Sequence, residues 1–279
     1  MITLVKRHTK LFLKDKASVF FSLFSVMIII TLYILFLSEN ISSNLPAFDE
    51  SSAFVFLWMF AGISAVTTAT ASLGALGKYM EDNVDQKSDD FLMTKITKQS
   101  LAYSYVYYSL IIGLIFTILL IGFGYVYTYI NYDFLLPISS TLIGIIVLST
   151  LMHTLFFYLV TSYLKTMSAF SGLSTIVGTL IGFLAGIYIP IGILPSYVQK
   201  VIVLFPTTQS TVLLRDLFMV EVLEPIKEVM PSEGYAEVVE MLGVKLYWNG
   251  EMLSNTFSWV YLITITVILM VLVFLRNKR

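Results

Sequence analysis

Residues 101–132 read LAYSYVYYSLIIGLIFTILLIGFGYVYTYINY and contain no Asp, Glu, Lys or Arg. A helix needs about 20 consecutive apolar residues to cross the roughly 30 Å of hydrocarbon in a bilayer. In lipid, a helix also pairs its own backbone N–H and C=O groups, which an isolated strand cannot do. This stretch therefore predicts a membrane-spanning helix.

Five further runs without a charged residue flank it, at 17–38, 51–77, 134–164, 166–199 and 252–275. The 279-residue chain is 57% hydrophobic and only 13% charged, whereas ordinary soluble domains carry about 25% charged residues. Each run exceeds the spanning length, so we expect an all-α integral membrane protein with six transmembrane helices. They are placed near 17–37, 53–77, 102–127, 136–162, 168–189 and 255–275.

The positive charges indicate an orientation. If the N-terminus is cytoplasmic, the inner segments hold 13 of the 17 Lys and Arg residues. Cytoplasmic loops carry an excess of Lys and Arg, so we expect both termini inside. The stretch after Lys16 lacks an Ala-x-Ala-like cleavage site, and we expect it to be retained as a span.

Two cytoplasmic segments stand out by their charge. Residues 1–16 are basic and amphipathic, which predicts an interfacial helix on the inner leaflet, with a plain positive-inside anchor as the alternative. Within 17–189, spans 2 and 3 are joined by the charged segment 78–100, where Phe91-Leu92-Met93 form an apolar patch among the charges. We expect that patch to be exposed for a partner, although it could simply pack on the helix ends.

The outer side is predicted from its prolines and its acidic residues. Residues 190–206 contain an apolar stretch between prolines that is too short to span, which predicts a re-entrant hairpin. The acidic segment 207–251 predicts helices near 208–223 and 233–242 with a break at Pro225. Residues 252–279 form the last span and a basic tail.

Small residues predict where helices pack closely. Residues 61–77 are mostly Ala, Gly, Ser and Thr, and Gly178, Gly182 and Gly186 recur at intervals of four in the fifth span. Small residues let helix backbones approach in lipid. The glycine face is therefore a packing seam within the chain, at a dimer interface or along a substrate route.

Several chemistries are excluded by missing residues. The chain has no Cys and a net charge of −1, which argues against thiol chemistry and a basic nucleic-acid surface. It has no phosphate-binding Gly-x-x-x-x-Gly-Lys-Ser/Thr loop, no His-Glu-x-x-His zinc motif and no Gly-x-Ser-x-Gly elbow. His153 is the one titratable group of the coupling kind that we expect within a span, either hydrogen-bonded to a neighbouring helix or serving as a proton relay. We infer that a partner supplies any energy for transport.

The order of these features resembles a known family. The basic entry helix, the six spans, the cytoplasmic segment and the series Gly186-Ile-Tyr-Ile-Pro190, Leu194-Pro195, Phe205-Pro206 and Leu214-Arg215 are similar to the membrane subunit of type-2 ATP-binding-cassette exporters. This resemblance implies that two membrane subunits, copies of this chain or close homologues, pair with two separate ATPase subunits in a bacterial-type cytoplasmic membrane. It also implies that ATP and Mg bind to the partner, that this chain binds no cofactor or metal, and that substrate leaves between the membrane subunits.

Site residues follow from the resemblance and from the expected cargo. The resemblance assigns ATPase coupling to Asp89, Asp90, Phe91, Leu92, Met93, Lys95 and Lys98, and an outer gate to Pro190, Pro195, Phe205 and Pro206. An amphipathic cargo needs apolar contact with sparse hydrogen bonds. In a homodimer this favours a translocation pathway along Phe20, Phe24, Tyr33, Thr67, Thr70 and Ser72.

The expected function is a permease subunit without enzyme activity of its own, which exports a drug, a peptide toxin or a lipid-like molecule. A passive channel or secondary carrier is the alternative, disfavoured because we expect no Asp, Glu or Lys within the spans. A membrane-embedded transferase or hydrolase is a third possibility, disfavoured by the lack of paired carboxylates or metal ligands. Seven Glu residues between 221 and 251 either solubilise the outer segment or attract cationic cargo.

Overall fold

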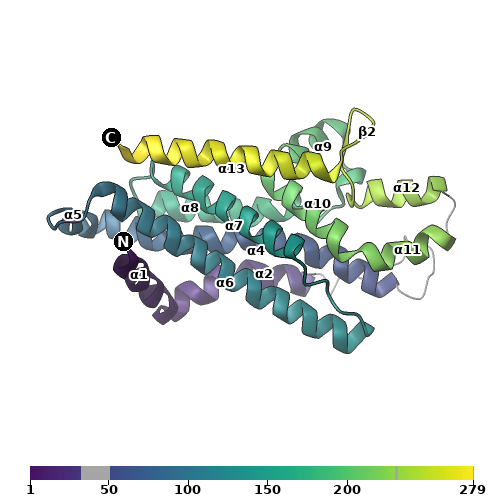
Figure 1. Cartoon of the computed structure of the whole chain (residues 1–279), viewed down its shortest axis with the longest axis horizontal. Helices are drawn as coiled ribbons and strands as arrows, with labels where there is room; N and C mark the ends of the chain where they lie inside the picture. The colour runs from purple at the N-terminus through teal and green to yellow at the C-terminus, as the bar shows by residue number, and fades with distance from the viewer. Residues whose placement is uncertain (33–50, 230–231, 279) are drawn as a thin grey trace.

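A computed structural model of the chain describes residues 1–32, 51–229 and 232–278, which are almost entirely α-helical (Figure 1). The helices of the first half are α1 (Ile2–Lys14), α2 (Lys16–Leu32), α4 (Ser51–Val84), α5 (Lys87–Leu92), α6 (Lys98–Tyr132) and α7 (Ser140–Thr161). The second half contains α8 (Met167–Leu184), the 3-10 turn η2 (Ile191–Ile193), α9 (Ser196–Val203), α10 (Pro206–Phe218), α11 (Val220–Val229), α12 (Ser232–Met241) and α13 (Asn255–Lys278). The prediction of an all-α chain is confirmed, apart from one small hairpin in which β1 (Tyr247–Trp248) pairs antiparallel with β2 (Glu251–Met252).

Among the described residues, the helices long and apolar enough to cross a membrane are α4, α6, α7, α8 and α13. They coincide with the predicted spans 2 to 6. A sixth results only if α9 and α10, which bend by 89° at their break, are counted together. The predicted first span begins in α2, and its last residues, 33–37, lie outside the described part.

The long helices run along one axis and give the molecule two distinct ends (Figure 1). The N-terminus, α1, α5 and the C-terminus gather at one end. The segments α9, α11, α12 and β2 gather at the other. The charged segment 78–100 and the acidic segment 207–251 therefore lie at opposite ends of the bundle.

Helix α4 is the centre of the bundle and packs against α2, α6, α7, α8 and α10. Nearly every residue from Ala53 to Leu76 is buried, which explains why this span is the richest in small residues. A Cβ on Gly113 of α6 would come within 2.6 Å of the Ser72 Oγ of α4. Helix backbones this close leave room only for small side chains.

Two local predictions were wrong. Helix α4 continues to Val84, beyond the end near residue 77 that was predicted for the second span, so the first part of segment 78–100 is helical. The break expected at Pro225 falls at Met219 instead, and Pro225 lies inside α11. A proline removes only one intrahelical hydrogen bond, and here that loss does not end the helix.

Candidate functional site

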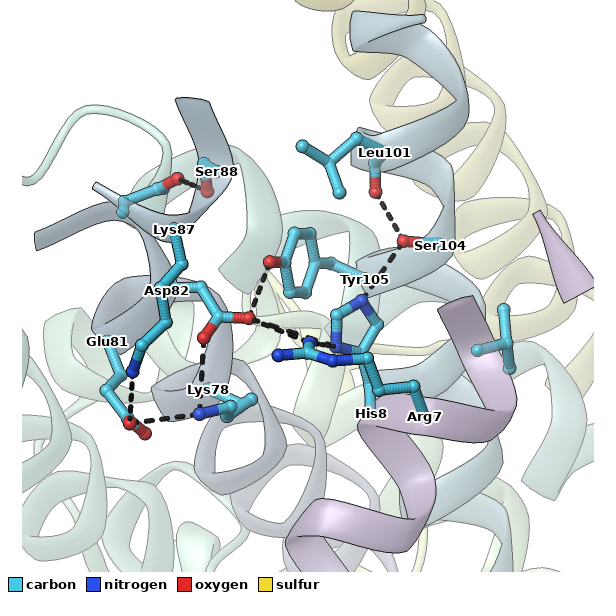
Figure 2. Close-up of polar contacts among 12 residues, drawn as sticks. Arg7, His8, Lys78, Glu81, Asp82, Lys87, Ser88, Leu101, Ser104 and Tyr105 are labelled. Carbon is cyan, nitrogen blue, oxygen red and sulfur yellow. Dashed lines mark hydrogen bonds and ion pairs between the residues drawn. The ribbon is translucent and has the colours of Figure 1, made fainter. Parts of the chain in front are cut away.

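A buried charge cluster lies at the end of the bundle that holds both termini (Figure 2). The Asp82 side chain, on the last turn of α4, has no exposed surface. Its Oδ1 lies 3.2 Å from the Lys78 Nζ, its Oδ2 lies 3.4 Å from the Arg7 Nη1, and it accepts a 2.8 Å hydrogen bond from the Tyr105 hydroxyl. A buried carboxylate requires such pairing, because its loss of hydration costs several kcal/mol. The cluster therefore ties α1 and α6 to the end of α4.

His8 completes the cluster without carrying charge. It is fully buried and stacks on the Tyr105 ring at 4.3 Å between centroids. Burial, and after it the charge of Arg7, lowers the pKa of His8 to about 4. The Ser104 hydroxyl already donates to the Leu101 carbonyl, so it accepts from the His8 Nε2, while the Nδ1 accepts from Arg7. At neutral pH, Asp82 is therefore balanced by Arg7 and Lys78.

The rim of the cluster connects it to α5. Glu81 lies 2.9 Å from the Lys78 Nζ and 3.4 Å from the Lys87 Nζ, at the start of α5. The Arg7 guanidinium also lies over the Phe91 ring, 4.9 Å from its centroid. Arg7 of α1 thus contacts both α4 and α5. A displacement of α5 would therefore act on α1 through Arg7.

The predicted coupling residues do not form one exposed patch. Phe91 is half-buried beneath Arg7, while Leu92 is 39% exposed and Met93 is 88% exposed. The polar residues of the set are all exposed, namely Asp89, Asp90, Lys95 and Lys98. The expectation of an exposed Phe91 was therefore wrong, because its ring serves to anchor α5 to the bundle.

A groove of about 710 Å³ opens beside the cluster. Its walls come from the junction of α1 and α2, from α4 and from α8. The lining residues with charged side chains are Asp15, Lys78 and Glu81. The rest of the lining is apolar or small, with hydroxyl groups from Thr70, Ser171, Ser174 and Thr175.

The predicted pathway residues are distributed differently from expectation. Thr70 lines the groove, but Thr67 and Ser72 are buried inside the bundle. Ser72 accepts hydrogen bonds at its carbonyl from the Ser109 hydroxyl and at its Oγ from the Thr154 hydroxyl, so it serves helix packing within one chain. On α2, Phe20 and Phe24 are both exposed and their rings lie 5.5 Å apart. Tyr33 lies outside the described residues.

At the opposite end a second buried charge, Arg215 of α10, joins three helices. The guanidinium donates to the carbonyls of Ala185 and Gly186 after α8, of Leu242 and Gly243 after α12, and of Trp58 in α4, at 2.9–3.4 Å. It also lies over the Trp58 ring, 4.5 Å from the centroid. The helix dipole makes such C-terminal carbonyls favourable for a cation.

Two glycines shape the Arg215 site. Gly186 and Gly243 have φ of +60° and +62° and end α8 and α12. At both ends the N–H after the glycine bonds back to the carbonyl five residues earlier, from Ile187 to Gly182 and from Val244 to Val239, which is the Schellman arrangement. Both helix ends therefore present carbonyls to one guanidinium.

The remaining predicted residues lie near these two sites. Pro190 precedes η2, Pro195 precedes α9, and Phe205 and Pro206 form the corner between α9 and α10, with Phe205 exposed. Gly182 faces the Tyr188 ring at a distance that leaves no room for a Cβ, and Gly178 lines the groove. The glycine row therefore contacts Tyr188 at Gly182 and lines the groove at Gly178.

His153 is held between two neighbouring helices. Its Nδ1 lies 2.9 Å from the Thr68 hydroxyl of α4 and its Nε2 lies 2.8 Å from the Thr207 hydroxyl of α10. The Thr68 hydroxyl donates to the Ala65 carbonyl, so it accepts from the Nδ1, and the Nε2 accepts from Thr207. Both ring nitrogens are used in packing, which favours the hydrogen-bonded role over a proton relay.

Sequence reasoning missed Asp82, His8 and the role of Arg215. Asp82 looked like one acid among many in a polar segment, and its spacing of four from Lys78 was the available signal. The signal for Arg215 was clearer than the signal for Asp82, because Arg215 follows the uncharged run Thr211-Val-Leu-Leu214 within α10.

Comparison with known proteins identifies no relative, so the function has to be argued from the chain's own residues. Models of protein families, curated proteins and solved structures gave no match. Within residues 1–32, 51–229 and 232–278, no group of three or more His, Cys, Asp or Glu is arranged to hold a metal ion. The functional argument therefore starts from α5, the Asp82 cluster and the groove.

Proposed function

We propose that this chain is the membrane-spanning permease subunit of an exporter of amphipathic molecules, energised by a separate ATP-binding-cassette ATPase. Two copies of the chain, or this chain and a close homologue, would pair with two ATPase subunits. The observation that carries the proposal is the end of α5, where Leu92 and the next residue, Met93, are exposed to solvent among exposed charges. An apolar pair in a charged surround is the composition expected of a docking site, in which apolar anchors bind and charges set the register.

The contacts of α5 support a mechanical role. Phe91 lies under Arg7, and Arg7 pairs with Asp82. Lys87 joins α5 to Glu81 near the end of α4. A partner that moves α5 would therefore move α1 and the end of α4 together, and both border the groove.

The distribution of charge favours a partner-driven exporter over an ion-coupled carrier. The Asp82 cluster lies at one end of the bundle, and Arg215 is enclosed by carbonyls at the other. Secondary carriers use ionisable groups that a coupling ion can reach near the midplane. His153, which lies between these ends, uses both ring nitrogens for helix packing.

The test is whether Leu92 and Met93 are needed for the chain to bind an active ATPase. The affinity-tagged chain, purified in mild detergent from the cells that produce it, should carry Mg-ATP hydrolysis activity with it. Leu92→Asp combined with Met93→Asp should remove most of that activity, because both side chains are exposed and their loss leaves the bundle intact. Phe91 is left unchanged because it also packs against Arg7.

The matched control places two charges on exposed apolar residues at the other end. Val220→Asp with Met252→Asp should leave the co-purified ATPase activity unchanged, since these residues lie in α11 and β2. If both pairs reduced the activity equally, or if neither did, docking at α5 would be wrong.

A further inference from the structure

We infer that the outer face of α1 binds the headgroups of anionic phospholipids in the membrane leaflet nearest the two termini. This lipid is a binding partner that the proposed function does not require. Three properties of α1 support the inference: the charge of its outer face, the lack of acidic partners there, and its depth relative to the exposed tyrosines of α6.

The two faces of α1 differ in burial and in charge. Its buried residues recur at intervals of four and so form one stripe toward the bundle, namely Leu4, His8 and Phe12. Each of them is followed two residues later by an exposed lysine, namely Lys6, Lys10 and Lys14. Two residues are a rotation of about 200° at 3.6 residues per turn. The three lysines therefore form a second stripe, on the side of α1 that faces away from the bundle.

The lysine stripe has no acidic partner within the described part of the chain. Helix α1 contains no Asp or Glu. None of the ion pairs between described residues includes Lys6, Lys10 or Lys14. Asp15, directly after α1, accepts from the Ala17 N–H and lines the groove, which none of the three lysines does. The outer face of α1 therefore presents three positive charges to its surroundings.

The exposed tyrosines of α6 indicate where the surface of a bilayer would lie. Helix α6 is long and apolar enough to cross a membrane, and Tyr107 and Tyr129 are exposed on it. They are 22 residues apart, or about 33 Å at 1.5 Å per residue, and the exposed residues between them are apolar or glycine. Tyrosine is enriched at both interfaces of a bilayer, whose hydrocarbon is roughly 30 Å thick. Tyr107, near the start of α6, therefore marks the interface of the leaflet nearest the termini.

Helix α1 lies at the depth of this interface. The His8 ring stacks on Tyr105 at 4.3 Å between centroids and lies 5.8 Å from Tyr108, and these two tyrosines flank Tyr107 in the chain. Figure 1 shows α1 at the end of the bundle where α6 begins and both termini gather. The lysine ammonium groups can therefore extend to the level of the phosphates while their apolar stems stay closer to the hydrocarbon.

The composition of the outer face favours a phospholipid over a soluble anion. Ile2 and Leu13 are exposed and adjoin the lysine stripe, because Ile2 is four residues before Lys6 and Leu13 is three residues after Lys10. Apolar side chains beside lysines can enter the acyl region while the lysines attract anionic headgroups. Phosphatidylglycerol offers acyl chains and a net negative charge, whereas the headgroup of phosphatidylcholine is neutral overall.

The test measures lipid binding to the purified chain in detergent, as an apparent Kd from native mass spectrometry. Dioleoyl phosphatidylglycerol and dioleoyl phosphatidylcholine have the same acyl chains and differ in headgroup charge. The unmodified chain should bind phosphatidylglycerol about tenfold more tightly or better. A basic residue near an anionic lipid surface contributes about 1 kcal/mol, which is roughly a fivefold change in Kd. Lys6→Gln, Lys10→Gln and Lys14→Gln together should therefore weaken binding of phosphatidylglycerol about tenfold or more and leave phosphatidylcholine unchanged.

The matched control removes the same number of positive charges elsewhere. Lys200→Gln, Lys227→Gln and Lys278→Gln together replace exposed lysines of α9, α11 and α13. This triple variant should change the Kd for phosphatidylglycerol by less than about twofold. Because all six lysines are exposed, neither triple variant removes a buried contact of the bundle.

A soluble phosphate separates the lipid from a free anion as the source of the headgroup. Glycerol 3-phosphate carries a phosphate without acyl chains, and at a concentration equal to that of the lipid it should not displace phosphatidylglycerol. Salt should weaken the preference for phosphatidylglycerol, since the screening length falls from about 10 Å at 0.1 M to about 3 Å at 1 M. Displacement by glycerol 3-phosphate, or a preference that is the same at both salt concentrations, would contradict the inference.

Three further results would overturn the inference: equal binding of both lipids by the unmodified chain, equal weakening in both triple variants, or unchanged binding in the α1 variant. If the α1 variant kept its lipid but lost the co-purified ATPase activity, the outer face of α1 would belong to a protein partner instead. Because the binding assay contains no ATPase, its outcome does not depend on the proposed function.

Discussion

Asp82 and Arg215 are both fully buried charges, and the chain compensates them in different ways. Asp82 is paired with two cations and a tyrosine hydroxyl. Arg215 pairs with no acid among the described residues and is surrounded by carbonyl oxygens from three helices. The Asp82 cluster should therefore lose stability when the carboxylate loses its charge. The Arg215 site should lose stability when the planar set of N–H donors is removed.

At the residue scale, Asp82→Asn should destabilise the chain strongly. The amide still accepts from Tyr105, but Arg7 and Lys78 lose their buried counter-charge. Removing one partner of a buried ion pair costs about 3 kcal/mol or more. For a chain of this size that corresponds to a thermal midpoint lower by roughly 6–12 °C. The midpoint is measured in one detergent at one heating rate, because unfolding of this kind is often irreversible.

The control for this prediction is Asp85→Asn, one turn further along the chain. Asp85 pairs with Lys87 at the surface, where such pairs contribute within about 0.5 kcal/mol. Its midpoint should stay close to that of the unmodified chain. Equal midpoints for Asp82→Asn and Asp85→Asn would show that the cluster does not hold α1 and α6 to α4.

At the scale of helices, the sequence pattern predicted most of the spans, but it did not predict where several helices end. The runs around α6, α7 and α13 were recognised because continuous apolar sequence has one stable form in lipid. The ends were less predictable. Helix α4 extends to Val84, where Asp82 contacts Arg7 of α1 and Tyr105 of α6, and α11 runs through Pro225. Such ends are decided by tertiary contacts, which local pattern does not contain.

Arg215 makes a prediction at this scale, because it holds α8, α10 and α12 together. Arg215→Met keeps a long unbranched side chain but removes all the hydrogen bonds to the carbonyls after α8 and α12. The end of α12 should detach, and glutamyl endopeptidase should cleave faster at Glu237 and Glu240. Arg215→Lys should not restore protection, because a point-like ammonium cannot reach carbonyls spread around a planar fork.

The matched control is Arg276→Met. Arg276 is exposed, donates to the Ser162 carbonyl and lies over the Tyr163 ring at the end that holds the termini. Its loss should leave cleavage near α12 unchanged. Cleavage that is unaltered by Arg215→Met would mean that the other contacts of α12 are sufficient to hold it.

At the scale of the whole molecule, the candidate site could be predicted only in part. Charge and apolar pattern predicted a charged segment with an apolar patch between spans 2 and 3, and α5 lies there, followed by the exposed Met93. The burial of Phe91 depends on the position of α1, and the groove depends on how α1, α4 and α8 pack together. The sequence of one segment does not determine such packing between segments. Thr67 and Ser72 were misassigned for the same reason, since a small polar face can pack inward as well as line a route.

The central claim is that ATP hydrolysed by a partner docked at α5 drives export through this chain. Its most direct test is uptake of trimethylammonium-diphenylhexatriene into inside-out vesicles from cells that produce the chain and its ATPase, measured with ion gradients collapsed by ionophores. We predict uptake that requires ATP, that is lost with Leu92→Asp and Met93→Asp together, and that is retained with Val220→Asp and Met252→Asp. Uptake driven by an imposed ion gradient without ATP, or unaffected by the changes at Leu92 and Met93, would contradict the account.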